Sequence, residues 1–139
     1  MGTHHLILGK TTDYITGQEI VETHDEQARQ KIARFLVEEK GYLKEDIEVR
    51  REILLNVDGN RATSKVDFLM RVDGKVFAIV IFGPGSLVTR ERSTVAAARL
   101  VESYAVPFAV VTNGKDAEVM ETRSGSVIGA GLEAIPSKD

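Results

Sequence analysis

A glycine-rich turn close to a pair of arginines is the part of this sequence whose residue types and spacing suggest chemistry. Gly83-Pro84-Gly85-Ser86 follows the apolar run 76–82 and precedes Arg90 and Arg92. Backbone N–H groups at such a turn can bind a phosphate or another anion when they point at one centre. Pro84 removes one donor, and no Walker-type phosphate-loop motif is present. An anion site and a plain strand-to-helix connection both remain open.

Arg90 and Arg92 also bear on whether an anion binds here. Arg90 and Arg92 are expected in the first turn of a helix, where positive charge opposes the helix dipole. A phosphate, a partner chain or a carboxylate such as Asp67 would offset that cost, and a solvated helix end is the alternative. Asp67 shares its strand face with Lys65 and Arg71, which predicts a partly exposed carboxylate paired with one of these cations.

Composition narrows the kinds of site and of protein. The chain has 139 residues, no cysteine, three histidines without metal-site spacing and a formal net charge of −3. This length fits one domain, and the missing cysteines exclude disulfides and thiolate metal sites. No apolar run reaches the length of a membrane span and no signal peptide is visible, so we expect a cytoplasmic protein without a membrane partner. The negative charge argues against nucleic-acid binding by the whole surface but leaves room for a local basic face.

Two helices are expected to position these side chains. The first begins after Thr23, because Thr23 and Glu26 have the spacing of a capping box, and it stops at Lys40-Gly41. For Glu26 this capping role alone is a sufficient explanation. The second helix spans about residues 89–104, where Ala96, Ala97 and Ala98 favour helix and allow close approach to a sheet.

Strands account for most of the remaining chain. Residues 47–57 and 64–72 alternate apolar and polar side chains, which predicts half-buried strands. Asp73-Gly74 is a strong hairpin signal. Residues 76–82 and 107–114 are apolar on both faces, which predicts central strands, with a parallel crossover between them. Residues 116–122 and 126–128 are expected to form a terminal hairpin.

The two ends of the chain show little pattern. We expect residues 1–22 to form an irregular surface arm, packed through Leu6 and Leu8, with a turn at Thr16-Gly17. The tail from Gly131 is also expected to be irregular. The element order α-β-β-β-α-β with an extra C-terminal β-hairpin predicts an α/β fold, a mixed central sheet flanked by helices.

Three segments carry a family resemblance: EQARQKIARFLVEEKGYLKEDIEVRREI (26–53), SKVDFLMRVDGKVFAIVIFGPG (64–85) and VPFAVVTNGKDAEVMET (106–122). Together with the element order, they resemble the N-terminal nuclease domain of type I restriction enzyme R subunits, within the restriction-endonuclease-like PD-(D/E)xK superfamily. The resemblance implies one restriction-endonuclease-like domain over residues 23–139, a DNA substrate or ligand, and Mg²⁺ as cofactor. The motor of such enzymes is not in these residues, so translocation would require a motor or other subunit on a separate chain.

The resemblance also implies where catalytic residues would lie. Asp67 matches the acid of the second strand and is a weak candidate for a metal ligand. Glu26 matches an acid on the first helix. The acid and lysine of the third strand fall at Val80 and Phe82, counted back from Pro84, and neither side chain can bind a metal ion or a proton. Lys65 and Glu91 are candidates for a catalytic group that has migrated to a neighbouring element.

These substitutions lead to the functional expectation. We expect a nuclease-family domain that acts on or binds DNA and has weak or no metal-dependent cleavage. A non-enzymatic module that docks DNA or protein is the alternative, and enzymatic activity itself stays open. The candidate side chains for contact with nucleic acid or another anion are Arg71, Ser86, Arg90, Arg92 and Arg99.

Overall fold

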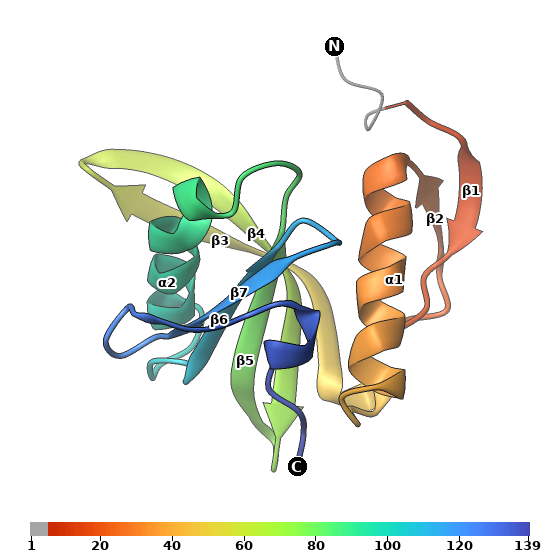
Figure 1. The fold of residues 1–139 in the computed structure, drawn as a ribbon. Helices are drawn as coiled ribbons and strands as arrows, with labels where there is room; N and C mark the ends of the chain where they lie inside the picture. Colours follow the sequence, from red (N-terminus) through yellow and green to blue (C-terminus); the bar gives the residue numbers. More distant parts are fainter. Residues whose placement is uncertain (1–5) are drawn as a thin grey trace.

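A six-stranded mixed sheet with one helix on each face forms the centre of the molecule (Figure 1). The computed structural model describes residues 6–139. The helices and strands are β1 (Gly9–Thr12), β2 (Glu19–Glu22), α1 (His24–Glu38), β3 (Ile47–Val57), β4 (Asn60–Val72), β5 (Lys75–Phe82), α2 (Glu91–Leu100), β6 (Phe108–Thr112), β7 (Ala117–Glu121) and β8 (Val127–Ala130). The α/β fold, the core order α-β-β-β-α-β and the C-terminal hairpin predicted from the sequence are confirmed.

The sheet has the order β3-β4-β5-β6-β7-β8, and only β5 and β6 pair in parallel. The antiparallel neighbours follow each other along the chain, as tight turns allow. Asp73 and Gly74 both have φ in the left-handed region, 54° and 81°, as a two-residue hairpin turn requires. The crossover from β5 to β6 runs through α2, which covers one sheet face, while α1 covers the other (Figure 1).

Helix α1 begins and ends where the sequence predicts. The Thr23 hydroxyl accepts a hydrogen bond from the Glu26 N–H at 3.0 Å. After the helix, Gly41 has φ 81° and the Tyr42 N–H donates to the Leu36 carbonyl at 3.2 Å, closing the last turn. Glu26, however, turns its carboxylate toward Gln30 and Arg29. Its side chain is therefore available to the site described below.

Strand β4 departs from the strict alternation expected for residues 64–72. Val66 lies in the core cluster beneath α2, whereas Phe68 and Met70 lie in the cluster beneath α1. In the partner strand β3, Arg50 has φ 56°, and the regular pairing of β3 with β4 skips Arg50 and Asp67. A backbone irregularity thus interrupts the predicted period beside Asp67.

The N-terminal segment is more ordered than expected. Residues 9–22 form the antiparallel hairpin β1–β2, with the predicted turn at Gly17, whose φ is 76°. Leu6 and Leu8 are 59% and 41% exposed, so the expectation that they pack this segment is wrong. Tyr14 and Ile15 contact the core instead. Four-residue strands such as Gly-Lys-Thr-Thr carry too little apolar alternation to be recognised.

Two boundaries near the C-terminus also differ from expectation. Helix α2 ends at Leu100, because the chain turns back so that the Val106 N–H donates to the Ala98 carbonyl at 3.0 Å and the Tyr104 hydroxyl to the Val76 carbonyl at 3.0 Å. The tail contains a short 3₁₀ turn at 132–134, and Ile135 is buried in the core. Neither described helix is long and apolar enough to cross a membrane.

Candidate functional site

Asp67 lies in the protein interior and has two partners. Its side chain is 3% exposed. One carboxylate oxygen, Oδ1, accepts from the Arg29 Nε at 2.9 Å, and Oδ2 accepts from the backbone N–H of Phe82 at 2.7 Å. The expected pairing with Lys65 or Arg71 is wrong. Lys65 is exposed, and Arg71 donates to Glu48 at 3.0 Å.

Arg29 connects every group of this site. Its Nε bonds Asp67, its NH1 nitrogen lies 3.6 Å from Glu26 Oε1, and its guanidinium lies over the Phe82 ring, 5.1 Å from the centroid. The structure therefore brings Asp67, Glu26 and Phe82 together around one partly buried cation. Arg29 is not among the candidates expected from the sequence. Its position three residues after Glu26, on the same helix face, was the available signal.

Burial sets the electrostatics of Asp67. Loss of solvent raises the pKa of its carboxyl above the ordinary value of 3.8. The Phe82 N–H, the Arg29 charge and hydrogen bond, and the more distant Lys65 charge all act in the opposite direction, without cancelling the effect of burial. Asp67 is therefore a carboxyl group whose ionised form depends on the Arg29 guanidinium.

The residues of this site do not fit a Mg²⁺ ion. Magnesium requires several oxygen ligands, usually including carboxylates. Both Asp67 oxygens already accept hydrogen bonds, and the Arg29 guanidinium contacts both Asp67 and Glu26. Val80 and Phe82 are buried hydrocarbon side chains. Among residues 6–139, no group of three or more Asp, Glu, His or Cys side chains is arranged to hold a metal ion.

The glycine-rich turn after β5 is covered by Arg90. Arg90 donates to the Pro84 carbonyl at 3.0 Å, and a Cβ placed on Gly83 would lie 1.0 Å from its guanidinium. Gly83 is thus needed for close approach of this side chain. Ser86 is exposed, and its carbonyl accepts from Thr89 Oγ1 at 3.3 Å. This arrangement favours a plain strand-to-helix connection, with the Arg90 side chain packed beside the turn.

Three further candidates lie elsewhere. Glu91, Arg92 and Arg99 line a cavity of about 300 Å³ that also borders Ser124 and Gly125. None of them is among the bonded partners of Asp67. Arg99 instead donates to the Thr122 carbonyl, at 2.9 and 3.2 Å. The structure therefore groups these candidates with one another rather than with Asp67.

Glu91 is paired with an acid that the sequence analysis did not identify. Burial raises the pKa of Glu118, and the neighbouring Glu91 carboxyl raises it further. Glu118 Oε1 is buried and has no hydrogen-bond partner among the described residues. Glu91 therefore belongs to a carboxyl pair on the α2 side of the sheet.

A second buried carboxylate connects the N-terminal hairpin to the site. Asp13 is 1% exposed and accepts from Thr16 Oγ1 at 2.6 Å, Gln30 Nε2 at 2.9 Å and Arg50 NH2 at 3.2 Å. Burial acts to raise its pKa, but these hydrogen bonds outweigh it and hold the pKa below 3.8. Gln30 also donates to Glu26 at 3.0 Å, so one polar network runs from Asp13 to Asp67. The sequence carried no signal for it.

The chain matches the model of a known protein family. The model of the family described as type I restriction enzyme R protein N terminus matches residues 24–136, which includes all of the site around Arg29. Comparisons with curated proteins and with solved structures gave no match.

Proposed function

The chain belongs to the family of type I restriction enzyme R protein N termini, and from this we propose that it is a DNA-binding domain without metal-dependent cleavage. In this proposal, the position that would hold a metal ion and a lysine in a similar nuclease is filled by groups of the chain itself. The Arg29 guanidinium supplies the positive charge between the acids, and the Phe82 ring supplies the surface on which it lies.

The bond between Arg29 and Asp67 is the observation that carries this proposal. A hydrated Mg²⁺ ion would have to displace a guanidinium that is bonded to a carboxylate 3% exposed to solvent. The displaced Arg29 would lose a charge-assisted hydrogen bond at 2.9 Å and its contact with Phe82. Glu26 and Asp67 alone would then have to coordinate the ion, because Val80 and Phe82 offer no oxygen ligand.

Basic side chains near the site support the DNA-binding part. Lys65 is exposed on β4, two residues before Asp67, and Arg90 lies against the turn that follows Phe82. Arg92, the second residue of α2, is a further exposed cation, although it lines the separate cavity with Glu91 and Arg99. With a net charge of −3, binding through such a local set should be weak and strongly dependent on salt. A protein partner that carries acidic groups is the alternative ligand for the same cations.

The test combines a binding assay with a cleavage assay. Fluorescence anisotropy with short duplex and single-stranded DNA should show binding that weakens steeply between about 50 and about 200 mM salt. Replacing Lys65 and Arg92 with Met should reduce both the affinity and the salt dependence, whereas Lys31→Met, an exposed position on α1, is the control. Incubation of supercoiled DNA with Mg²⁺ or Mn²⁺ should give no nicks. Absence of any DNA binding at low salt would favour the protein partner, and nicking that requires Asp67 would refute the proposal.

A further inference from the structure

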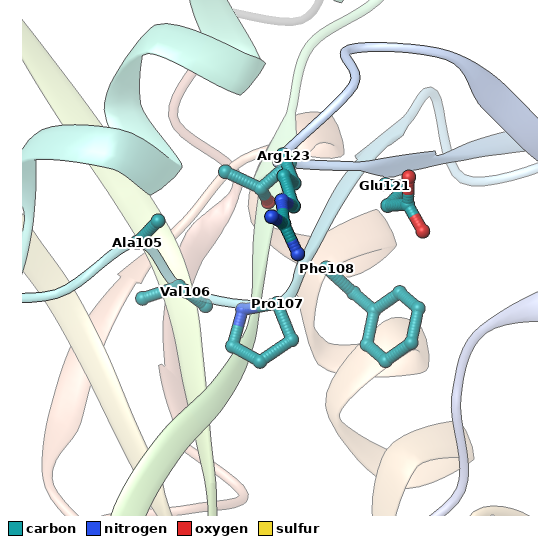
Figure 2. Close-up of a pocket in the computed structure, with 7 residues that line it drawn as sticks. Ala105, Val106, Pro107, Phe108, Glu121 and Arg123 are labelled. Atoms are coloured by element: carbon teal, nitrogen blue, oxygen red, sulfur yellow. The ribbon is translucent and has the colours of Figure 1, made fainter.

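A cavity of about 430 Å³ lies at the opposite end of β6 from the Arg29 site. It is lined by Ala105, Val106, Pro107, Phe108, Glu121, Thr122 and Arg123 (Figure 2). Phe82 pairs with Thr112 at one end of the parallel ladder, and Ala78 pairs with Phe108 at the other. These pairs are offset by four residues along β5, which corresponds to about 13 Å along the strand. This cavity is therefore separate from the site already described.

Two neighbouring rings give the cavity an apolar side. Pro107 and Phe108 both project into the space shown in Figure 2. The Phe108 ring packs edge-on against Phe77, with a centroid separation of 5.1 Å and an interplanar angle of 72°. That contact fixes the orientation of the Phe108 ring before a ligand arrives, so a flat ligand would find a rigid platform.

Charged groups of opposite sign border this platform. Glu121 is the direct cross-strand partner of Phe108, and Arg123 follows two residues later. In Figure 2 the Arg123 guanidinium points toward the space between Pro107 and Phe108, and Glu121 lies on the Phe108 side. Among residues 6–139, neither side chain has a hydrogen-bond or ion-pair partner. The cavity thus offers the Arg123 guanidinium as a hydrogen-bond donor and the Glu121 carboxylate as an acceptor, both beside one apolar surface.

A buried hydroxyl in the cavity wall also lacks a partner. Thr122 is fully buried, and its Oγ1 accepts and donates no hydrogen bond within the described part of the chain. Its backbone is held in place, because the Thr122 N–H donates to the Pro107 carbonyl at 3.1 Å and its carbonyl accepts from Arg99. An unpaired buried hydroxyl is costly, which makes this wall an unusual place in a folded domain.

We propose that this cavity binds an unstacked guanine base. Guanine is flat, so it can stack on Phe108 and Pro107. Its O6 and N7 atoms accept from the two-pronged donor of an arginine, here Arg123. Its N1–H and N2–H groups donate to a carboxylate, here Glu121. Adenine presents an amino donor where guanine has O6, and a pyrimidine has no N7, so both fit this pair of groups less well.

Other ligand classes match the cavity less completely. A simple anion would bind Arg123 but would be repelled by Glu121. A purely apolar ligand would remove water from both charged groups without replacing their hydrogen bonds. A free amino acid could pair with both charges, and it is therefore included in the test as a competitor.

Titration with guanosine monophosphate, followed by amide chemical shifts, tests the proposal. We expect shifts confined to residues 105–108 and 121–123 and a Kd on the order of 1 mM or tighter. Adenosine and cytidine monophosphates should bind at least about tenfold more weakly. No binding up to about 10 mM, equal binding of adenosine monophosphate, or displacement by phenylalanine would overturn the proposal.

Two substitutions test whether Arg123 and Glu121 recognise guanine specifically. Arg123→Met should weaken binding of guanosine monophosphate roughly 10-fold to 100-fold. Glu121→Gln should abolish the preference for guanine while leaving the fold unchanged, and it serves as the second test if Arg123→Met does not fold. Arg61→Met, at an exposed position in the β3–β4 hairpin, is the matched control. Unchanged affinity in both cavity variants would refute the assignment.

The base could come from a free nucleotide or from a nucleic-acid strand. A short oligonucleotide with one guanine among thymines should bind at least about tenfold more tightly than guanosine monophosphate if a strand is the natural source. Equal or weaker binding of the oligonucleotide would indicate the free nucleotide. The guanine test is independent of the proposed function. Arg123→Met removes the guanine preference but leaves Lys65 and Arg92 unchanged, so the DNA binding proposed for those two residues can still be measured in this variant.

Discussion

At the scale of single residues, the pair formed by Arg29 and Asp67 determines what the site can do. Burial raises the pKa of the Asp67 carboxyl, so its ionised form is maintained only by donors held close to it. Arg29 donates from one side, and the Phe82 backbone N–H donates from the other. The same contacts that keep Asp67 charged occupy the oxygen atoms that a metal ion would use.

Removal of Arg29 should expose this dependence. Arg29→Met leaves Asp67 buried without its cation, so we expect a loss of about 3 kcal/mol in the free energy of unfolding, measured by urea denaturation at neutral pH. Lys31→Met, two residues away on the exposed side of the same helix, should change it by less than about 0.5 kcal/mol.

The double variant identifies the cause of that loss. If the penalty arises from the unpaired carboxylate, adding Asp67→Asn to Arg29→Met should recover most of it, with a coupling free energy of about 1–3 kcal/mol. Additive losses from the two substitutions would show instead that Arg29 stabilises the helix without acting on Asp67.

The raised pKa of Asp67 also predicts a pH dependence. Above its ordinary value of 3.8, the carboxyl ionises in the unfolded chain while the folded protein still holds the proton, so stability is lost as the pH rises through this interval. Asp67→Asn lacks this titration. Its free energy of unfolding should therefore improve relative to the natural protein between acidic and neutral pH, as urea titrations at several pH values would show. If the free energy of unfolding changed equally with pH in both proteins, the pH dependence would not come from the raised pKa of Asp67.

At the scale of elements, ion pairs fix the edge strand β3 to its neighbours. The Glu48 carboxylate accepts from Arg51 at 2.6 Å and from Arg71 on β4 at 3.0 Å. Arg51 in turn donates to the Val101 carbonyl at 2.9 Å and to Glu102 at 2.6 Å, beyond the end of α2. The strand is thereby connected to both of the elements it borders.

Replacement of Glu48 should reveal the strength of this connection. The arginines lower the pKa of Glu48 from 4.5 to about 2, so the pair stabilises the fold above pH 4.5 and is lost as the pH falls toward 2. Glu48 is 33% exposed, and solvent screening reduces the expected effect of Glu48→Gln to about 1 kcal/mol at neutral pH. The difference from the natural protein should vanish near pH 2. A difference that persists there would mean a packing effect.

The N-terminal hairpin should depend on Asp13 in a similar way. Asp13→Asn weakens the contacts to Arg50 and Gln30, so we expect a loss of about 1–3 kcal/mol. Hydrogen exchange should accelerate first in the amides of residues 9–22, because these contacts hold the hairpin to α1 and β3. Uniform acceleration across the sheet would show that the hairpin does not open separately.

The sequence contains strong signals for the elements and weak ones for the site. Asp73-Gly74, the alternation in β3 and the apolar run of β5 each have a local physical cause, so the sheet could be predicted. Arg29, Asp13 and Gln30 are ordinary polar residues in sequence, and only the fold joins them to Asp67 in one network. The Phe82 N–H bonds Asp67, so the end of β5 lies beside this carboxylate, while the catalytic register counted back from Pro84 stays a prediction.

At the scale of the whole molecule, the sheet separates distinct chemical environments. The α1 face carries the network from Asp13 through Gln30 and Arg29 to Asp67, whereas Glu91 and Glu118 lie on the α2 side. The cavity beside Arg123 lies at the opposite end of β6 from Phe82. The Asp67 network can therefore be altered by substitution without direct contact with the cavity beside Arg123, whereas Arg99 on the α2 side contacts the Thr122 carbonyl in the wall of that cavity.

We propose that Arg29 occupies the position that a catalytic metal ion would need. Titration with Mn²⁺, following free Mn²⁺ by electron paramagnetic resonance, tests it directly. The natural protein should bind no Mn²⁺ tighter than about 10 mM, and Asp67→Asn should give the same titration. One equivalent of bound Mn²⁺ that disappears in Asp67→Asn would contradict this account.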